Sequence, residues 1–411
     1  MENIKETLMK SSNKLVTTSA LASAVVTLLA QPALASDSAL DTLMTDGTTK
    51  VDFRYRYEGV TQDGIDENAA ANTLRSRVTF TSGSVNDFSF KLEMDDSRPL
   101  FSENYNSVTN GKTDYPVVAD PKGTDLNQAF VQYKSGAFIA IGGRQRILLD
   151  DQRFVGGVGW RQNEQTYDGL TLKLGSGNFT GSYSYVNNVN RIFGPNGSAA
   201  QAADWRGNVH LANGTFTLVE DHKLTGFIYA MDFDNAAAAS NNTYGLRYTG
   251  KLGPVNLKAS YATQSEAGDN PAEYTANYML ADVGGKVASK LSWNLGYEVL
   301  GSDGGAKSFI TPLATLHKWQ GWADKFLSTP AAGIKDMYAT VGTKAGPVKL
   351  SLTYHNFTSD FGSTDLGSEI DAVAVYPITK KVKTVLKYAN YSADTHASDT
   401  SKVWFMLQVS L

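Results

Sequence analysis

The hydrophobic pattern of this chain is dominated by short segments in which apolar and polar residues alternate strictly. Residues 51–58 read VDFRYRYE, and residues 74–80, 88–94, 291–299, 348–354 and 403–411 repeat the pattern. Successive side chains of a β-strand point to opposite faces, so a period of two predicts strands with one apolar and one polar face. We count about eighteen such segments along the chain.

The segments are joined by connectors whose lengths alternate. Short connectors fall at residues 82–87, 135–136, 175–177, 252–254 and 345–347, and long polar ones at 59–72, 96–124, 147–164, 188–204 and 302–333. Short turns at one rim and long loops at the other are typical of outer-membrane barrels. The sequence therefore predicts an all-β fold, a single transmembrane antiparallel β-barrel of about 18 strands with short periplasmic turns and long extracellular loops.

A soluble β-sandwich also alternates, and it is the competing prediction. Two features favour the barrel. The expected strands are about nine to eleven residues long, near the length that spans a bilayer. Their apolar faces carry Tyr and Phe at the ends, as interfacial girdles do. Because a barrel must close on itself to pair its edge strands, we expect one barrel domain, residues 36–411.

One segment departs from the alternation. Residues 311–327 read TPLATLHKWQGWADKFL, and their apolar positions recur every three or four residues, which predicts a helix that starts at Thr311-Pro312. Large apolar patches are usually covered, so we expect the segment to fold over or into the pore mouth. It is then either a lid that protects loop edges or a constriction that faces the solute. The candidate pore-loop residues are His317, Lys318, Trp319, Trp322 and Lys325.

The N-terminus has the pattern of a secretory signal. Lys5, Lys10 and Lys14 accompany an apolar run at residues 15–30, and Ala33-Leu34-Ala35 is a small-x-small cleavage site. We predict a signal peptide over residues 1–35, with an uncleaved anchor as the alternative. After cleavage, the barrel prediction places the protein in the outer membrane of a Gram-negative bacterium, in contact with lipid and lipopolysaccharide.

Charge gives the first indication of function. Without residues 1–35 the chain keeps 37 − 3 = 34 Lys and Arg and 41 − 2 = 39 Asp and Glu, so it is acidic. Alternation nevertheless assigns more bases than acids to the polar, inward face. The inward acids are Asp52, Glu58, Glu93, Asp95 and Glu298; the candidate pore-lining bases are Arg54, Arg56, Arg75, Arg77, Arg144, Arg146, Arg161, Lys173, Arg206 and Arg247.

Every arginine lies between Arg54 and Arg247, so one wall of the channel is expected to carry the guanidinium groups. A basic wall concentrates anions, and the planar guanidinium binds carboxylates well. This pattern predicts a porin-like channel for passive diffusion of anionic small solutes or acidic oligosaccharides. The alternative is that the arginines pair with inward acids and brace the barrel wall.

Other chemistry finds little support in the sequence. The chain has no cysteine, which excludes disulfides and thiol chemistry, and its five histidines lack metal-ligand spacing. The Asp360-Phe361-Gly362 tripeptide lacks the glycine-rich loop and lysine strand of a kinase. We therefore expect no enzyme activity, no metal, no cofactor and no nucleic-acid partner. Trp160, Trp319 and Trp322 are loop residues that can stack on sugar rings.

Four blocks of the sequence resemble the alginate-export family of outer-membrane proteins. They are residues 143–170 (GRQRILLDDQRFVGGVGWRQNEQTYDGL), 185–194 (YVNNVNRIFG), 204–211 (DWRGNVHL) and 311–327, in the order of the family. The resemblance implies a monomeric barrel with an arginine-rich conduit for a polyuronate. It implies roles for Arg144, Arg146, Arg153, Arg161, Arg191 and Arg206. It leaves open a dedicated secretion conduit for an anionic polysaccharide such as alginate, and a receptor or adhesion barrel that acts through its loops.

Overall fold

The computed structural model describes residues 37–198, 200–287 and 290–411, so the expected signal peptide, residues 1–35, lies outside the described residues. Its main sheet has eighteen strands. The first nine are β1 (Thr48–Gln62), β2 (Ala69–Thr81), β3 (Phe88–Asn104), β4 (Gly123–Ser135), β5 (Phe138–Gln145), β6 (Thr166–Ser176), β7 (Phe179–Asn190), β8 (Asp204–Val219) and β9 (His222–Phe233). The others are β10 (Asn241–Leu252), β11 (Val255–Glu266), β12 (Thr275–Val287), β13 (Leu291–Leu300), β16 (Ile334–Ala345), β17 (Val348–Thr358), β18 (Asp365–Pro377), β19 (Val382–Ala393) and β20 (Thr400–Ser410).

Smaller elements lie outside this sheet. They are the helix α2 (Asp37–Thr45), the single turns η2 (Ala237–Ala239) and η3 (Leu316–Lys318), and the short pair β14 (Ser302–Asp303) and β15 (Lys307–Ser308). In the described ranges we find no helix with the length and apolar character needed to cross a membrane.

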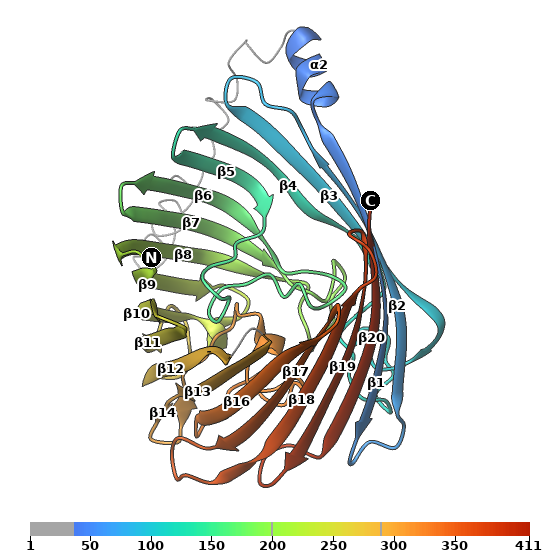
Figure 1. The fold of residues 1–411 in the computed structure, drawn as a ribbon, viewed down its shortest axis with the longest axis vertical. Helices are drawn as coiled ribbons and strands as arrows, with labels where there is room; N and C mark the ends of the chain where they lie inside the picture. The colour runs from blue at the N-terminus through green and yellow to red at the C-terminus, as the bar shows by residue number, and fades with distance from the viewer. Residues whose placement is uncertain (1–36, 199, 288–289) are drawn as a thin grey trace, which may run out of the picture.

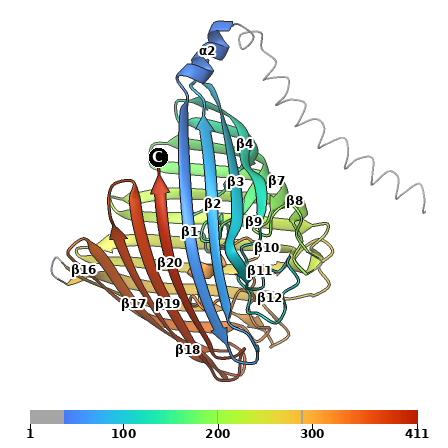
Figure 2. The ribbon, with the colours of Figure 1, turned by 90° about the vertical axis from the view of Figure 1, so that its right-hand side faces the viewer.

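The sheet closes into a barrel. Each of its strands pairs antiparallel with the next in the chain, and β20 pairs with β1, from Asp52 opposite Ser410 to Gln62 opposite Thr400. Figures 1 and 2 show the first and last strands side by side. Closure leaves no sheet edge with unpaired backbone groups, which is the condition for a sheet to stand in lipid. The predicted eighteen-stranded antiparallel β-barrel is confirmed.

Alternation along the strands separates an outer and an inner face. On β1, Phe53 is 37% exposed, whereas Arg54 and Arg56 on the other face are 4% and 0% exposed. The same alternation around the barrel leaves large apolar side chains on the outside. They include Val78, Leu92, Leu174, Ile228, Leu246, Leu295, Leu352, Leu386 and Phe405. A continuous apolar outer face matches the surroundings that acyl chains provide.

The two ends of the barrel differ in their connectors. One end carries short turns at residues 136–137, 177–178, 220–221, 253–254 and 346–347, and the other carries connectors at 105–122, 146–165, 191–203 and 301–333. We call these the short-turn end and the long-loop end. Helix α2 lies at the short-turn end, where the Gly83 amide donates a hydrogen bond to the Leu43 carbonyl (2.9 Å) beside the β2–β3 turn (Figure 2).

Two long connectors fold into the barrel (Figure 1). We call residues 146–165, between β5 and β6, the first inner loop, and residues 301–333, between β13 and β16, the second inner loop. The Phe154 ring of the first lies 5.0 Å from the rings of Phe227 and Tyr278 on the wall and 5.9 Å from Phe309 of the second. Both loops share one hydrophobic core with inward side chains of the strands. The barrel interior at this end is therefore packed.

The prediction of a helix over residues 311–327 is wrong, because only the single turn η3 is helical there. Gln320, Gly321 and Asp324 have φ values of 49°, 79° and 63°, which a right-handed helix does not allow. Barrel walls and the first inner loop surround the segment, so Leu313, His317 and Phe326 are all buried without one shared helical face. The segment does fold into the barrel, as expected.

The outer face generates a first testable prediction. Leu352→Arg places a charge among the apolar side chains of β17, and we expect it to lower the free energy of unfolding by about 2–4 kcal/mol near the bilayer centre. Urea titration of the barrel folded into lipid vesicles measures this. The neighbouring Ser351 lies on the inner face of the same strand, so Ser351→Arg is the matched control and is expected to cost much less. Equal losses for the two variants would contradict the assignment of faces.

Candidate functional site

Strands β1 and β2 place four arginines on the inner face. Arg54 lies opposite Arg75, so alternation brings two like charges together across the strand pair, whereas Arg77 lies opposite Asp52. Such an arrangement is stable only when acids enter among the guanidinium groups. The first inner loop and β3 supply those acids.

Glu164 of the first inner loop lies at the centre of this group. Its carboxylate accepts a hydrogen bond from Arg77 (Nη1–Oε1, 2.8 Å) and another from Arg146. Burial alone raises the pKa of a carboxyl, but here the Arg77 and Arg146 charges outweigh it and lower the pKa of Glu164 to about 2. Glu93 and Asp95 of β3 complete the group by pairing with Arg146 and Arg77. The wall and the first inner loop are thus joined by paired charges.

A second group joins both inner loops to β1. Arg161 of the first inner loop contacts Glu58 of β1 (3.0 Å) and Asp324 of the second inner loop (3.1 Å). Arg56 pairs with Asp120 at 3.0 Å, and both side chains are 0% exposed. Despite burial, Glu58, Asp120 and Asp324 together raise the pKa of Arg161 above its ordinary value. In this group, as in the first, each arginine contacts at least one carboxylate.

Two further arginines fasten the apolar side of the barrel. Arg153 donates hydrogen bonds to Glu298 of β13 (2.7 Å), to Thr311 (3.1 Å) and to Gln320 (3.1 Å), so it connects both inner loops to the wall. Arg247 of β10 pairs with Asp151 (2.5 Å), an acid that sequence reasoning would leave in an exposed loop. The buried arginines therefore match the bracing alternative, because nearly all of them meet an acid.

Arg54 is the exception among these arginines. It is buried, and its guanidinium donates to the Gln162 side chain and to the carbonyls of Gly159 and Arg161. Neutral acceptors on the first inner loop therefore satisfy its hydrogen-bonding groups. This guanidinium also holds the loop rather than facing an open path.

Two predicted pore-lining arginines lie elsewhere. Arg144 lies opposite Asp168 in the strand pairing. Along β5, Phe138, Gly142 and Arg144 are all even-numbered positions, so Arg144 lies on the same outer face as Phe138. Arg206 pairs in register with Asn188, and its side chain is 68% exposed. Sequence alternation assigned both to the lumen because it took apolar residues as lipid-facing. Near the long-loop end the inner face is itself apolar, with Tyr167, Val209 and Leu211 packed on the inner loops.

Lysines, not arginines, hold the inner positions near the short-turn end. Lys173 is inward and exposed, as are most of the corresponding lysines on other strands, whereas Lys91 is half-buried beside the Phe130 ring. We call this set the lysine rim: Lys50, Lys91, Lys134, Lys173, Lys223, Lys286, Lys344, Lys349 and Lys383. None of them forms an ion pair within the described residues, whereas Lys251 and Lys258 approach Asp221 and Asp282 at 4.0 and 3.9 Å. Inward lysines therefore outnumber inward acids at this end.

The candidate pore-loop residues contact different parts of the barrel interior. His317 and Trp322 meet Lys387 of β19: the His317 Nε2 lies 2.6 Å from the Lys387 Nζ, which lies 3.6 Å from the centre of the Trp322 ring. Lys318 donates to the Asp151 carbonyl (2.9 Å), and Trp319 packs on Arg153. Burial and repulsion by Lys402 lower the pKa of Lys325 to about 8.

Sequence reasoning missed the acids that neutralise the arginines. Asp120, Glu164 and Asp324 all come from connectors, where no alternation assigns a face, and Glu369 and Asp371 of β18 contact the second inner loop or its neighbours. No periodic signal in the sequence marks the three connector acids, whereas Glu369 and Asp371 alternate with the outward Ile370 on β18. In the described ranges, no group of three or more His, Asp and Glu is arranged to hold a metal ion.

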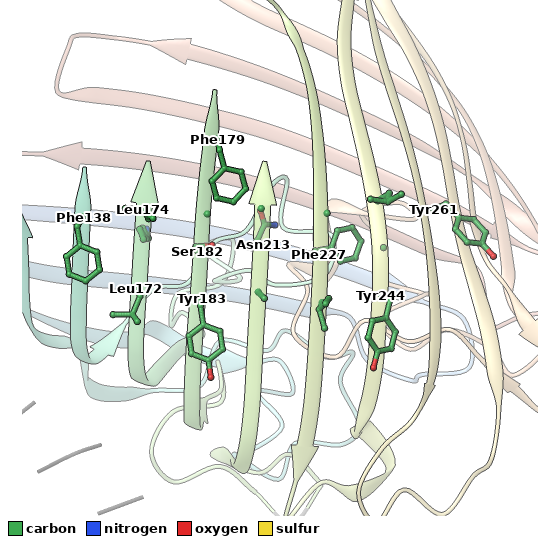
Figure 3. Close-up of a pocket in the computed structure, with 18 residues that line it drawn as sticks. Phe138, Leu172, Leu174, Phe179, Ser182, Tyr183, Asn213, Phe227, Tyr244 and Tyr261 are labelled. Atoms are coloured by element: carbon green, nitrogen blue, oxygen red, sulfur yellow. The ribbon is translucent and has the colours of Figure 1, made fainter. Parts of the chain in front are cut away.

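A surface hollow lies on the outside of the barrel (Figure 3). Its lining includes the outward side chains Phe138, Phe179, Tyr183, Tyr244 and Tyr261 from β5 to β11 (Figure 3). Gly181 and Gly214 leave the floor low beneath the Phe179 ring. Because this wall is the apolar outer face, we assign the hollow to the lipid side and do not include it in the solute path.

Comparison with known proteins agrees with this architecture. Residues 48–298 match the family described as alginate export, which covers more than half of the chain. The chain belongs to the alginate export family, and its fold is a closed antiparallel β-barrel. No match is found among curated protein sequences.

Solved structures with the same fold are outer-membrane channels. Acinetobacter baumannii OccAB4 is 14% identical, with a TM-score of 0.69 over 89% of this chain and 98% of that one. Pseudomonas aeruginosa OccK3 (OpdO) is 13% identical, with a TM-score of 0.66 over 90% and 97%. Acinetobacter baumannii OccAB2 is 15% identical, with a TM-score of 0.66 over 90% and 99%. At these identities the likeness concerns the fold.

The Glu164 group generates a second prediction. The pKa of Glu164 is lower in the folded protein than its ordinary value of 4.5, so its stabilisation is complete above about pH 4.5 and is lost as the pH falls towards 2. Glu164→Gln should lower the free energy of unfolding by about 3 kcal/mol at pH 7 and by little near pH 2. Urea titration at both pH values measures this.

Glu67→Gln is the matched control, because Glu67 is exposed in the β1–β2 connector. We expect this control to stay within about 0.5 kcal/mol of the wild-type protein at both pH values. A Glu164→Gln loss that is the same at pH 7 and pH 2 would show that the carboxylate charge does not hold the loop.

Proposed function

We propose that this protein is an outer-membrane channel through which anionic small solutes or acidic oligosaccharides diffuse passively. The family and the fold support the channel class. The lysine rim supports the anion preference, because it places unpaired ammonium groups on the inner face at the short-turn end. A basic surface inside a narrow passage raises the local concentration of anions and lowers that of cations.

The difference between lysine and arginine supports this mechanism. The buried arginines are engaged with acids or carbonyls, so they hold the inner loops and leave little net charge for a solute. An ammonium group on a flexible stem remains hydrated and contacts a passing anion briefly. Permeation needs contacts that attract the solute and yet release it, and hydrated, separated lysines meet that requirement.

A second candidate, a dedicated conduit for an anionic polysaccharide such as alginate, is favoured by the family match over residues 48–298. A polyanion would meet several lysines of the rim at once, and linked weak contacts add to a larger avidity. Channel recording with a uronate oligomer distinguishes the two: a long-lived block favours the conduit, and brief passage events favour the porin. In either case we propose a monomer, exported and surrounded by lipid and lipopolysaccharide.

A third prediction tests the lysine rim. The triple variant Lys223→Gln/Lys349→Gln/Lys383→Gln should lower the anion-to-cation permeability ratio several-fold, because it removes inward positive charge. Reversal potentials in planar bilayers under a chloride or gluconate gradient give the ratio. Wild-type cation preference would refute the proposed function itself.

The control keeps the change in net charge and moves it to the long-loop connectors. Lys112→Gln/Lys122→Gln/Lys307→Gln removes three lysines outside the rim. We expect a much smaller change in the ratio. If both triple variants reduce it equally, the lysine rim has no special part in selectivity.

A fourth prediction concerns Arg144. Its side chain is on the outward set of β5 and pairs with Asp168 (2.8 Å), so Arg144→Ala should leave the permeability ratio unchanged. The measurement is the same reversal potential. A clear fall in anion preference would place Arg144 on the solute path after all.

A further inference from the structure

The second inner loop contacts the β18–β20 wall through polar and apolar groups, and His317 supplies one of the polar contacts. Others are the Asp324–Lys402 ion pair and the Glu369 carboxylate, which accepts from the Trp322 and Ala323 amides, while Phe326 packs on Tyr391.

The His317 Nδ1 lies 2.6 Å from Asp324 Oδ1 within the same loop, and the His317 Nε2 lies 2.6 Å from Lys387 Nζ on β19. The Trp160 ring of the first inner loop stacks on the imidazole at 4.4 Å, with 9° between the planes. His317 is only 6% exposed, so water does not mediate these contacts.

Asp324 and Lys387, the two hydrogen-bond partners of His317, limit where protons can lie in this contact. A carboxylate only accepts hydrogen bonds, so the Nδ1 of His317 carries a proton that it donates to Asp324. Between His317 Nε2 and Lys387 Nζ, one nitrogen donates and the other accepts. An ammonium group that donates to the Nε2 of a neutral imidazole gives the His317–Lys387 pair one positive charge. The ring faces of Trp322 and Trp160, 3.6 and 4.2 Å from Lys387 Nζ, favour placing that charge on the lysine.

Other charged groups around the pair come from every element packed on it. The cations are Arg161 of the first inner loop, Arg56 of β1 and Lys402 of β20, and the acids are Asp324, Glu58 of β1, Asp120 of the β3–β4 connector, and Glu369 and Asp371 of β18. Most of these acids already contact a cation: Asp324 meets Lys402 (2.7 Å) and Arg161 (3.1 Å). Glu369 and Asp371 are the exceptions: within the described residues neither pairs with a Lys or Arg, and Asp371 lies 3.8 Å from His355 Nε2.

We infer that the His317–Lys387 contact is an acid-sensitive latch: uptake of a second proton by the pair separates the two side chains and releases residues 311–327 from the barrel wall. Two unit positive charges 2.6 Å apart in a water-poor site repel strongly. The segment carries several apolar residues at the pore mouth, so its release alters the passage. This inference concerns the position of the loop and does not depend on which solute passes.

The direction of the pH effect follows from the environment of His317. Burial, together with the Lys387 and Arg161 charges, lowers the pKa of His317 well below its ordinary value, although Asp324 opposes this. Because His317 binds a proton less readily when the loop is against the wall, this position of the loop is fully stabilised above the ordinary pKa of histidine, about 6.5. That stabilisation is lost progressively as the pH falls below this value. The latch is therefore closed at neutral pH and weakened in acid.

The absence of cysteine from the chain makes a direct test possible. Ala323→Cys places a thiol at a buried position of the segment, where Ala323 is 2% exposed, and Ser328→Cys places one at an exposed position of the same loop. Full-length protein is folded in lipid vesicles and labelled with a methanethiosulfonate reagent at pH 7.5 and pH 5. The Ser328→Cys rate corrects for the effect of pH on thiol reactivity.

We expect the corrected Ala323→Cys rate to rise at least about tenfold at the lower pH, the factor that one pKa unit represents. The rise should disappear in the His317→Gln background, which cannot take up the proton, and in the Lys387→Met background, which removes the second charge. His210→Gln, on the exposed outer face, is the matched control and should keep the rise.

An unchanged wild-type rate between the two pH values would overturn the inference. So would a rise that persists in either His317→Gln or Lys387→Met, because another group, such as Asp324, would then be responsible. If one of these variants does not fold, the other still decides. Loss of anion preference in bilayer recordings would refute the proposed function and leave the labelling result intact.

Discussion

Closure of the sheet is the constraint on which the rest of this molecule depends. A strand in lipid has no water to satisfy its backbone groups, so the pairing of β20 with β1 completes a structure that an open sheet of the same strands could not keep in a membrane. Closure also creates an enclosed interior at the long-loop end. Two connectors enter that interior, and the side chains that meet them are selected for packing and charge pairing and not for contact with water.

Charge inside the barrel is divided by position. Near the long-loop end, Arg77, Arg153 and Arg161 join the wall to the inner loops through Glu164, Glu298 and Glu58. A guanidinium donates hydrogen bonds in several fixed directions, so one arginine can connect the wall to an inner loop. Near the short-turn end the lysine rim occupies the inner face, and within the described residues none of its members forms an ion pair. Bracing and solute attraction thus use different bases in different places.

The second inner loop also contacts the wall through both apolar and polar side chains. Its apolar residues share one core with strands all around the barrel, including Tyr391 of β19 and Trp404 of β20, whereas its contacts with Lys387 and Glu369 are polar. Apolar packing is insensitive to pH, whereas the His317–Lys387 contact depends on how many protons the two side chains share. A loop held in part by a proton-dependent contact can change position without unfolding the barrel, since the strands pair independently of it.

The sequence by itself determined the strands, their number and the apolar outer face, because a period of two is a local property that each segment carries alone. It also placed Arg54, Arg56, Arg75 and Arg77 correctly on the inner face. Only the tertiary structure decided what those arginines meet, since Asp120, Glu164 and Asp324 lie in connectors whose paths no periodicity describes. For the same reason alternation misplaced Arg144 and Arg206: the inner loops give the barrel a second apolar environment, and Val209 and Leu211 face it. The three- and four-residue spacing in residues 311–327 reflected burial on several sides, which a helix and an enclosed irregular loop both produce.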